Sequence, residues 1–158
     1  AEVDGQAAVG AVFDVVRQEL FSAGRGLGST RDGQPIRVSQ ATDLQLALVG
    51  TGFSYEPERR RLQAQVLVEV LPRVRDIRRQ GAAALDLCSV ACGRLDGYYE
   101  WGLAPWDLAA GGLIAAEAGA EVTDVKGDDA SAGAVVAAAP GIAQALRDLL
   151  TAAGAADA

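Results

Sequence analysis

Apolar and polar residues alternate along the first third of the chain, the pattern of β-strands with one buried face. Glycine-rich segments separate the apolar stretches, and one of them contains Asp32-Gly33, a frequent hairpin turn. The pattern predicts that residues 1–50 form part of an antiparallel sheet. The predicted strands cover residues 9–15, 20–23, 36–38 and 44–49, and the predicted turns cover 24–28 and 31–35.

From about residue 56 onward the apolar spacing lengthens to that of amphipathic helices. Leu62, Val66 and Val70 recur every four residues between Pro57 and Pro72, which predicts one helix with a single buried face. Further helices are predicted at 82–92, 107–118 and 140–152, and short strands at 74–78, 96–100, 121–125 and 134–138. This alternation predicts a layered α/β structure over residues 56–153, and residues 154–158 are expected to fray.

The length of 158 residues, half of them hydrophobic, suits one domain with a buried core. We find no internal repeat and no linker that would divide the chain. No apolar run reaches the roughly 18 to 20 residues that cross a bilayer. No basic segment precedes an apolar stretch, as it would in a secretory signal. We therefore expect a cytoplasmic protein without a membrane anchor.

Charge and residue usage narrow the chemistry further. The net charge of −7 argues against a general nucleic-acid binder, whose affinity depends on Lys and Arg. The absence of His excludes Ser-His-Asp triads and Cys/His zinc sites. Cys88 and Cys92 lie four residues apart on a predicted helix, where a disulfide has poor geometry, so we interpret both as small core residues. Any chemistry must use carboxylates, hydroxyls or a metal ion.

The run Gly24-x-Gly26-x-Gly28 is a possible phosphate-binding loop. Such a loop needs a helix directly after the glycines, so that the helix N-terminus faces the phosphate. Here Asp32-Gly33 and another strand follow instead. We therefore interpret the glycines as a β-turn.

Two carboxylates flank a short turn in the second half. Tyr98-Tyr99-Glu100 ends a predicted strand, and Pro105-Trp106-Asp107 begins a predicted helix. Taken alone, Asp107 would be a helix N-cap, because Asp is favoured there and complements the helix dipole. The pair is more specific, because open α/β structures bind ligands at strand ends.

The segment from Gly81 to Gly119 resembles the inositol monophosphatase family, and it is most similar to the bacterial inositol-1-monophosphatases. The resemblance rests on Trp-Asp-x-Ala-Ala-Gly at 106–111 with Tyr-Tyr-Glu at 98–100, and it extends from about residue 9 to 142. It implies that Asp107 is a catalytic Mg²⁺ ligand and that Glu100 accepts hydrogen bonds from substrate hydroxyls. The residues that it implies as backbone contacts to the substrate are Gly81, Ala82 and Ala83.

The resemblance also implies a reaction, the hydrolysis of inositol 1-phosphate or a similar polyol phosphate by water activated on Mg²⁺. Fructose-1,6-bisphosphatase-like, histidinol-phosphatase-like and nucleotide 3′-phosphatase activities remain open within the family. Arg78 and Asp96 match an ion pair that the family places near its dimer contact, and the resemblance implies a homodimer; the alternative for both residues is a solvated surface charge. An alternative outside enzymology is an interaction module that binds a partner through its sheet and the Arg59–Arg61 face.

The family's catalytic unit has a further signature, Asp-Pro-x-Asp-Gly-Thr, which supplies metal-binding aspartates and a water-activating threonine. No Asp-Pro dipeptide occurs in this sequence. The resemblance therefore implies that residues 1–158 correspond to the C-terminal portion of the family's fold. We expect this chain alone to be inactive, because it would carry one metal ligand and the substrate-recognition side.

Overall fold

The computed structural model describes residues 1–131 and 133–155. Its strands are β1 (Glu2–Val3), β2 (Gln6–Ala7), β3 (Val9–Asp14), β4 (Glu19–Gly24), β5 (Gly28–Arg31), β6 (Gln34–Pro35), β7 (Leu48–Thr51), β8 (Asp76–Arg78), β9 (Gly97–Trp101), β10 (Glu121–Thr123) and β11 (Ala134–Ala138). Its helices are α1 (Pro57–Val70), α2 (Ala83–Ala91), α3 (Pro105–Glu117) and α4 (Pro140–Ala152), with 3₁₀ turns at Leu44–Leu46 and Leu71–Arg73.

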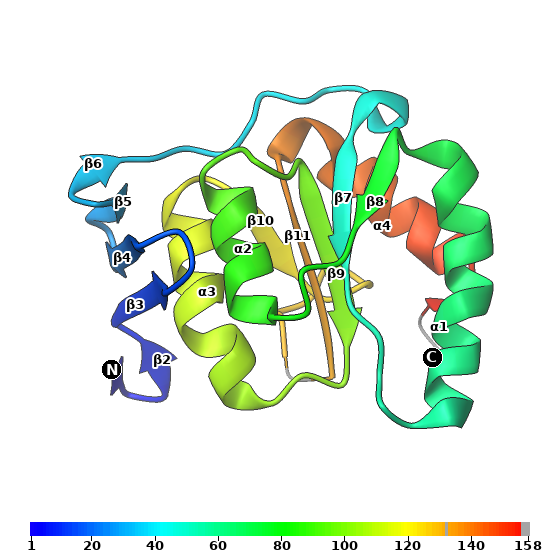
Figure 1. Cartoon of the computed structure of the whole chain (residues 1–158), viewed down its shortest axis with the longest axis horizontal. Coiled ribbons are helices and arrows are strands. Elements are labelled where there is room, and N and C mark those ends of the chain that lie inside the picture. Colours follow the sequence, from blue (N-terminus) through cyan, green and yellow to red (C-terminus); the bar gives the residue numbers. More distant parts are fainter. Residues whose placement is uncertain (132, 156–158) are drawn as a thin grey trace.

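These elements form alternating layers of sheet and helix (Figure 1). The antiparallel sheet β3-β4-β5-β6 packs on α2 and α3, and the sheet β10-β11-β9-β7-β8 lies behind these helices. Helices α1 and α4 cover the other face of the five-stranded sheet. The predicted fold, an antiparallel sheet followed by alternating helices and short strands, is confirmed.

The N-terminal sheet agrees with the predicted alternation up to Pro35. Strand β3 pairs with β4 in a regular antiparallel register from Val9↔Gly24 to Asp14↔Glu19. Phe21 on β4 is buried against the helices, whereas Phe13 on β3 is 50% exposed on the outer face. One face of this sheet is therefore in the core, and the other presents apolar side chains outward.

The prediction for residues 36–50 was wrong in three places. Residues 36–38 form no strand: Ile36 N donates to Ser29 O at 3.0 Å, and Val38 N donates to Ala118 O at 3.2 Å. Residues 44–46 form a 3₁₀ turn, because the Asp43 side chain accepts a hydrogen bond from Gln45 N. Leu48–Thr51 is a parallel strand of the other sheet, so residues 1–50 do not belong to one antiparallel sheet.

The five-stranded sheet is buried on both faces, and three of its strands run in the same direction. Tyr98 on β9 faces the core beside α2 and α3, whereas Tyr99 and Trp101 face the core beside α1 and α4. Strand β7 runs parallel to both β8 and β9. The carboxyl ends of these three strands therefore lie at one edge of the sheet.

Most helix boundaries agree with their sequence signals. Helix α4 begins at Pro140 and ends at Ala152, and Gly93 and Gly119, both at positive φ, follow α2 and α3. In α1, however, Leu62 is 43% exposed and Gln63 is buried in its place. The Gln63 side chain accepts a hydrogen bond from Ser54 N at 2.7 Å, which accounts for its inward position.

The remaining predictions on cysteines and the tail have mixed outcomes. Cys88 is buried and Cys92 is half-buried, both as free thiols, and burial raises the pKa of Cys88 to about 12. Ala155 is buried, so the expected fraying from Gly154 was wrong there, and residues 156–158 lie outside the described part. None of the described helices is long and apolar enough to cross a bilayer.

Candidate active site

A cavity of about 270 Å³ lies at the carboxyl ends of β7, β8 and β9. Three connections form its walls: the segment after β7, the segment between β8 and α2, and the segment from the end of β9 into α3. All the residues predicted for the site line it, namely Gly81, Ala82, Ala83, Glu100 and Asp107. Positions far apart in the sequence thus meet at one edge of the sheet, where parallel strands present their ligand-binding loops.

Asp107 occupies the third position of α3, and Ala104, not Asp107, is the N-cap residue. Asp107 Oδ2 accepts a hydrogen bond from Ala104 N at 2.9 Å, so the side chain closes the helix start from inside. The interpretation of Asp107 as an N-cap was therefore wrong in position. Asp107 Oδ1 accepts no hydrogen bond from the described residues, which leaves that oxygen available for a ligand.

Glu100 is half-buried and held in place by its neighbours. The Tyr98 hydroxyl donates a hydrogen bond to Glu100 Oε2. Burial raises the pKa of Glu100, while this hydrogen bond opposes the rise. A Cβ atom at Gly52 would overlap the Glu100 carboxylate, so a larger residue at position 52 would displace that carboxylate from its present position. The Tyr98 hydroxyl and the space left by Gly52 thus position Glu100, and this contact with Gly52 was not predicted from the sequence.

Backbone groups of the β8–α2 connection form the opposite wall. Gly81 has φ +84°, a left-handed conformation that favours glycine, and Ala82 caps α2 without a side-chain hydrogen bond. The N-terminal ends of α2 and α3 both reach this cavity. Their first amide groups and their partial positive charge favour a bound anion such as phosphate.

The buried carboxyl group of Asp86 holds the β8–α2 connection in place through a hydrogen bond with Gln80. Gln80 Nε2 donates to Asp86 Oδ1 at 3.1 Å and also contacts Ser89 Oγ at 2.9 Å. Asp86 is 1% exposed. Its burial raises its pKa to about 7; the hydrogen bond from Gln80 opposes this rise and the nearby Glu100 carboxylate adds to it. The signal that could have revealed Asp86 is an acidic residue within the apolar run Ala84-Leu85-Asp86-Leu87.

The expected ion pair between Arg78 and Asp96 is not formed within the described residues. Arg78 contacts Asp76, while Asp96 accepts hydrogen bonds from Ser39 Oγ at 2.6 Å and Leu48 N at 2.7 Å. Strand β7 lies between β8 and β9 in the sheet, which separates the two side chains.

The described residues provide only part of a metal site. Among residues 1–131 and 133–155, no group of three or more His, Cys, Asp or Glu side chains could hold a metal ion. The oxygen donors of Asp107 and Glu100 suit Mg²⁺, which prefers oxygen ligands and retains several waters. Asp107 is therefore one prospective ligand of a site that needs further donors.

The glycine-rich run at 24–28 is the β-turn that was predicted, between β4 and β5. The Glu117 carboxylate of α3 accepts hydrogen bonds from Gly26 N at 2.8 Å and Gly28 N at 2.9 Å. These amides, which could have bound a phosphate, bind a carboxylate of the same chain.

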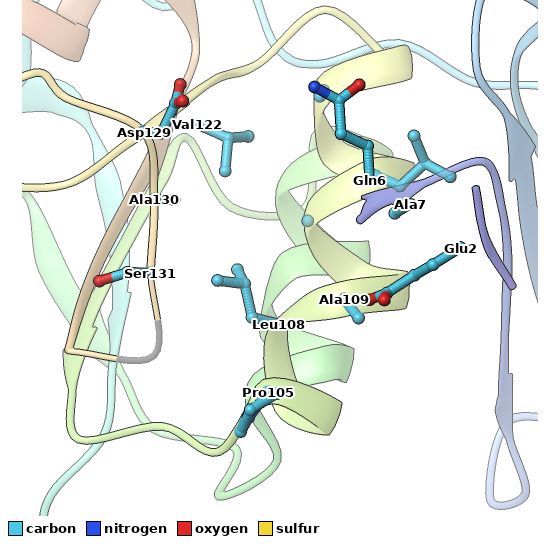
Figure 2. Close-up of a pocket in the computed structure, with 13 residues that line it drawn as sticks. Glu2, Gln6, Ala7, Pro105, Leu108, Ala109, Val122, Asp129, Ala130 and Ser131 are labelled. Atoms are coloured by element: carbon cyan, nitrogen blue, oxygen red, sulfur yellow. The ribbon is translucent and has the colours of Figure 1, made fainter. Parts of the chain in front are cut away.

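A wider groove of about 500 Å³ runs along α3 (Figure 2). Glu2, Gln6 and Ala7 reach it from the N-terminal hairpin, and residues 129–131 approach from the other side. Helix α3 contributes mainly apolar side chains, and Glu2 and Asp129 are the only charged residues that line the described groove. This groove lacks the converging polar groups that a catalytic site requires.

A profile of the inositol monophosphatase family matches residues 1–155. The chain belongs to the inositol monophosphatase family. One relative is the inositol-1-monophosphatase of Mycobacterium leprae, 54% identical over 152 residues, which are 92% of this chain and 52% of the relative. A Nus factor SuhB from Xylella fastidiosa is 45% identical over 128 residues, which are 80% of this chain and 46% of that protein.

A solved member of the family has the same fold. Mycobacterium tuberculosis SuhB superimposes with a TM-score of 0.88 at 49% identity, over 96% of this chain and 62% of that one. The chain described here spans about half the length of the curated relatives that it matches. The family assignment from the sequence is thus confirmed.

Proposed function

We propose that this chain supplies the alcohol-recognition side and one metal ligand of a Mg²⁺-dependent phosphomonoesterase. Its substrate would be inositol 1-phosphate or a similar polyol phosphate. The observation that carries the proposal is the meeting of Glu100, Asp107 and Gly81–Ala83 in one cavity at the carboxyl ends of parallel strands. Membership of the inositol monophosphatase family and a relative named inositol-1-monophosphatase support it.

Each group has a distinct role in this proposal. Asp107 would bind Mg²⁺ through Oδ1, because Oδ2 already accepts the hydrogen bond from Ala104 N. When bound, Mg²⁺ neutralises phosphoryl oxygens and lowers the pKa of bound water. Glu100, fixed by Tyr98, would accept hydrogen bonds from substrate hydroxyls. The amides at the starts of α2 and α3 would attract the phosphoryl group.

We also infer, from the family resemblance, that the protein is a homodimer and that it lies in the cytoplasm. Fructose-1,6-bisphosphatase-like, histidinol-phosphatase-like and nucleotide 3′-phosphatase activities use the same type of reaction, and a substrate panel separates them.

We predict that this chain alone releases no phosphate from inositol 1-phosphate, because its described residues offer no complete metal cluster. A chimera that joins it to the part of the Mycobacterium leprae relative that it does not span is expected to release phosphate at a rate comparable to that relative's. Phosphate release is measured across a Mg²⁺ titration, with EDTA as the control.

Two results would contradict this account. Efficient Mg²⁺-dependent release by the chain alone would show that its own residues complete the site. A chimera that folds and binds Mg²⁺ but releases no phosphate from any substrate in the panel would refute the phosphatase proposal.

A second function is favoured by the relatives named Nus factor SuhB. A role in such a complex needs a surface and no metal site. The outer face of the N-terminal sheet offers one, because Val9, Phe13 and Leu20 are 58%, 50% and 46% exposed. Replacing Asp107 by Asn separates the two functions, since it removes a metal ligand and leaves this face unchanged.

A further inference from the structure

Four buried polar atoms lie between the five-stranded sheet and helix α1, beside the candidate active site. Each belongs to a residue that is at most 5% exposed. None of them has a hydrogen-bond partner among the described residues; they are Thr51 Oγ1, Gln63 Nε2, Tyr99 OH and Trp101 Nε1. Buried polar atoms in native proteins are nearly always hydrogen-bonded, because an unpaired atom loses its hydrogen bonds to water without replacing them. Four such atoms in one place indicate a bound group that pairs with them.

The fold brings these four side chains to one face of the sheet. Thr51 on β7 is paired with Tyr99 on β9, so both side chains point to the same side. The rings of Tyr99 and Trp101 make an edge-to-face contact there, with their centroids 5.3 Å apart. Gln63 lies on the inward side of α1, one turn before Val66. Val66 belongs to the same core cluster as the two aromatic residues, so α1 packs directly over them.

This polar cluster adjoins the candidate active site through neighbours in the chain. Thr51 directly precedes Gly52, and Trp101 directly follows Glu100. Gly52, Glu100 and Trp101 all line the candidate active site. A group that holds the cluster together would therefore also fix the ends of β7 and β9 relative to each other, and with them the position of Glu100.

The hydrogen-bonding groups of the cluster match those of one water molecule. Gln63 Nε2 and Trp101 Nε1 are donors, and the hydroxyls of Thr51 and Tyr99 can both accept. Burial raises the pKa of Tyr99 to about 12, although a contact with the Thr51 side chain opposes the rise, so this hydroxyl is neutral at physiological pH. A water molecule accepts two hydrogen bonds and donates two, so it can pair with all four atoms at once.

A small anion such as chloride is the other ligand to consider, because hydroxyls can also donate. A buried anion would need a positive charge beside it to offset the loss of its hydration. No Lys or Arg is buried in the part of the chain that the structure describes. The surroundings of the cluster therefore favour a neutral ligand.

We propose that one buried water molecule binds between β7, β9 and α1, through Thr51, Gln63, Tyr99 and Trp101. This water links the strand that carries Glu100 to the loop after β7, because Gln63 Oε1 also accepts a hydrogen bond from Ser54 N at 2.7 Å. The four side chains are thus positioning residues for the candidate active site. The inference depends on the fold and on these side chains, and it does not depend on the reaction proposed above.

A high-resolution crystal structure of the full chain tests the site directly. We expect one density peak, refined as water, within hydrogen-bond distance of at least three of the four atoms. A second crystal grown in sodium bromide distinguishes water from an anion, because bromide gives an anomalous signal. Three results would overturn the proposal: an anomalous peak at the site, a water that contacts fewer than three of the atoms, or direct hydrogen bonds among the side chains with no peak between them.

Oxygen-17 relaxation dispersion of water tests the same site in solution, because it detects long-lived internal water and not exchanging hydroxyl hydrogens. The variant that combines Thr51→Val with Tyr99→Phe removes both hydroxyls and nearly preserves the shapes of the side chains. The water would then keep two partners, fewer than the about three that buried waters have. We therefore expect the variant to lose the contribution of one water molecule to the dispersion.

The matched control is Tyr98→Phe, the neighbouring tyrosine on the opposite face of β9. Its hydroxyl donates to Glu100 and belongs to the other core cluster. This control should leave the dispersion unchanged. Equal dispersion in the double variant and the original chain would contradict the proposed water.

Hydrogen exchange of the Ser54 amide tests the positioning role. When the water is lost, Gln63 keeps one contact fewer, so the Ser54 N–H that it holds is expected to exchange at least about tenfold faster in the double variant. The control is Thr30→Val, which removes a hydroxyl that pairs with Ser22 Oγ in the N-terminal sheet, and it should not change this rate. Loss of the water with unchanged exchange at Ser54 would overturn the positioning role.

Discussion

Replacing Asp107 by Asn is expected to reduce the phosphate-release rate of the chimera by about 10²- to 10³-fold, the scale seen when one electrostatic group is removed from an active site. Asn keeps the size of the side chain, and its amide oxygen can still accept the hydrogen bond from Ala104 N, so the start of α3 should remain intact. The negative charge that would hold Mg²⁺ is lost. The measurement is kcat and its dependence on Mg²⁺ concentration.

The matched control is Asp148→Asn on α4, which removes the same charge from an exposed position hydrogen-bonded by Gln144. This control should leave kcat and the Mg²⁺ dependence unchanged. If Asp107→Asn behaved like the control, Asp107 would be a helix-start residue and nothing more.

Replacing Asp86 by Asn is expected to stabilise the chain at alkaline pH by up to about 4 kcal/mol, the free energy that corresponds to its pKa shift. Burial raises the pKa of Asp86 from 3.8 to about 7. Between these values the unfolded chain loses a proton that the folded chain still holds, so the stability contributed by this group falls as pH rises. The loss is complete above about pH 7, and Asn, which carries no charge, avoids it.

The difference in unfolding free energy between the Asp86→Asn variant and the original chain should therefore be near zero at pH 4 and largest at pH 8. Denaturant unfolding across this range measures it. Asp14→Asn is a control of opposite sign, because hydrogen bonds from the backbone and side chain of Arg17 lower the pKa of Asp14. That variant should lose stability above pH 3.8. Equal stability of the Asp86→Asn variant and the original chain at pH 8 would contradict the raised pKa of the buried Asp86 carboxyl.

Local sequence signals predicted the ends of the helices and the strands in which apolar and polar residues alternate. Pro140 marked the start of α4, and Gly93 and Gly119 marked the ends of α2 and α3, because these residues act through their own backbone conformation. The motif around Glu100 and Asp107 identified residues that the fold does bring together.

Long-range pairing could not be predicted in the same way. Leu48–Thr51 is a short apolar run, and such a run does not reveal whether its neighbours are parallel or antiparallel. The buried Gln63 accepts a hydrogen bond from Ser54 N in a loop, and Gly52 leaves the space that the Glu100 carboxylate occupies. These constraints exist only in three dimensions.

The most direct test of the central claim is the position of the ligands in a crystal of the chimera grown with Mn²⁺, inositol and inorganic phosphate, the two products of the proposed reaction. We predict a Mn²⁺ anomalous peak on the Asp107 carboxylate and an inositol hydroxyl within hydrogen-bond distance of Glu100, with the Gly81–Ala83 backbone beside the ligand. Ligands bound only in the groove along α3, or Mn²⁺ that leaves Asp107 free, would contradict the account.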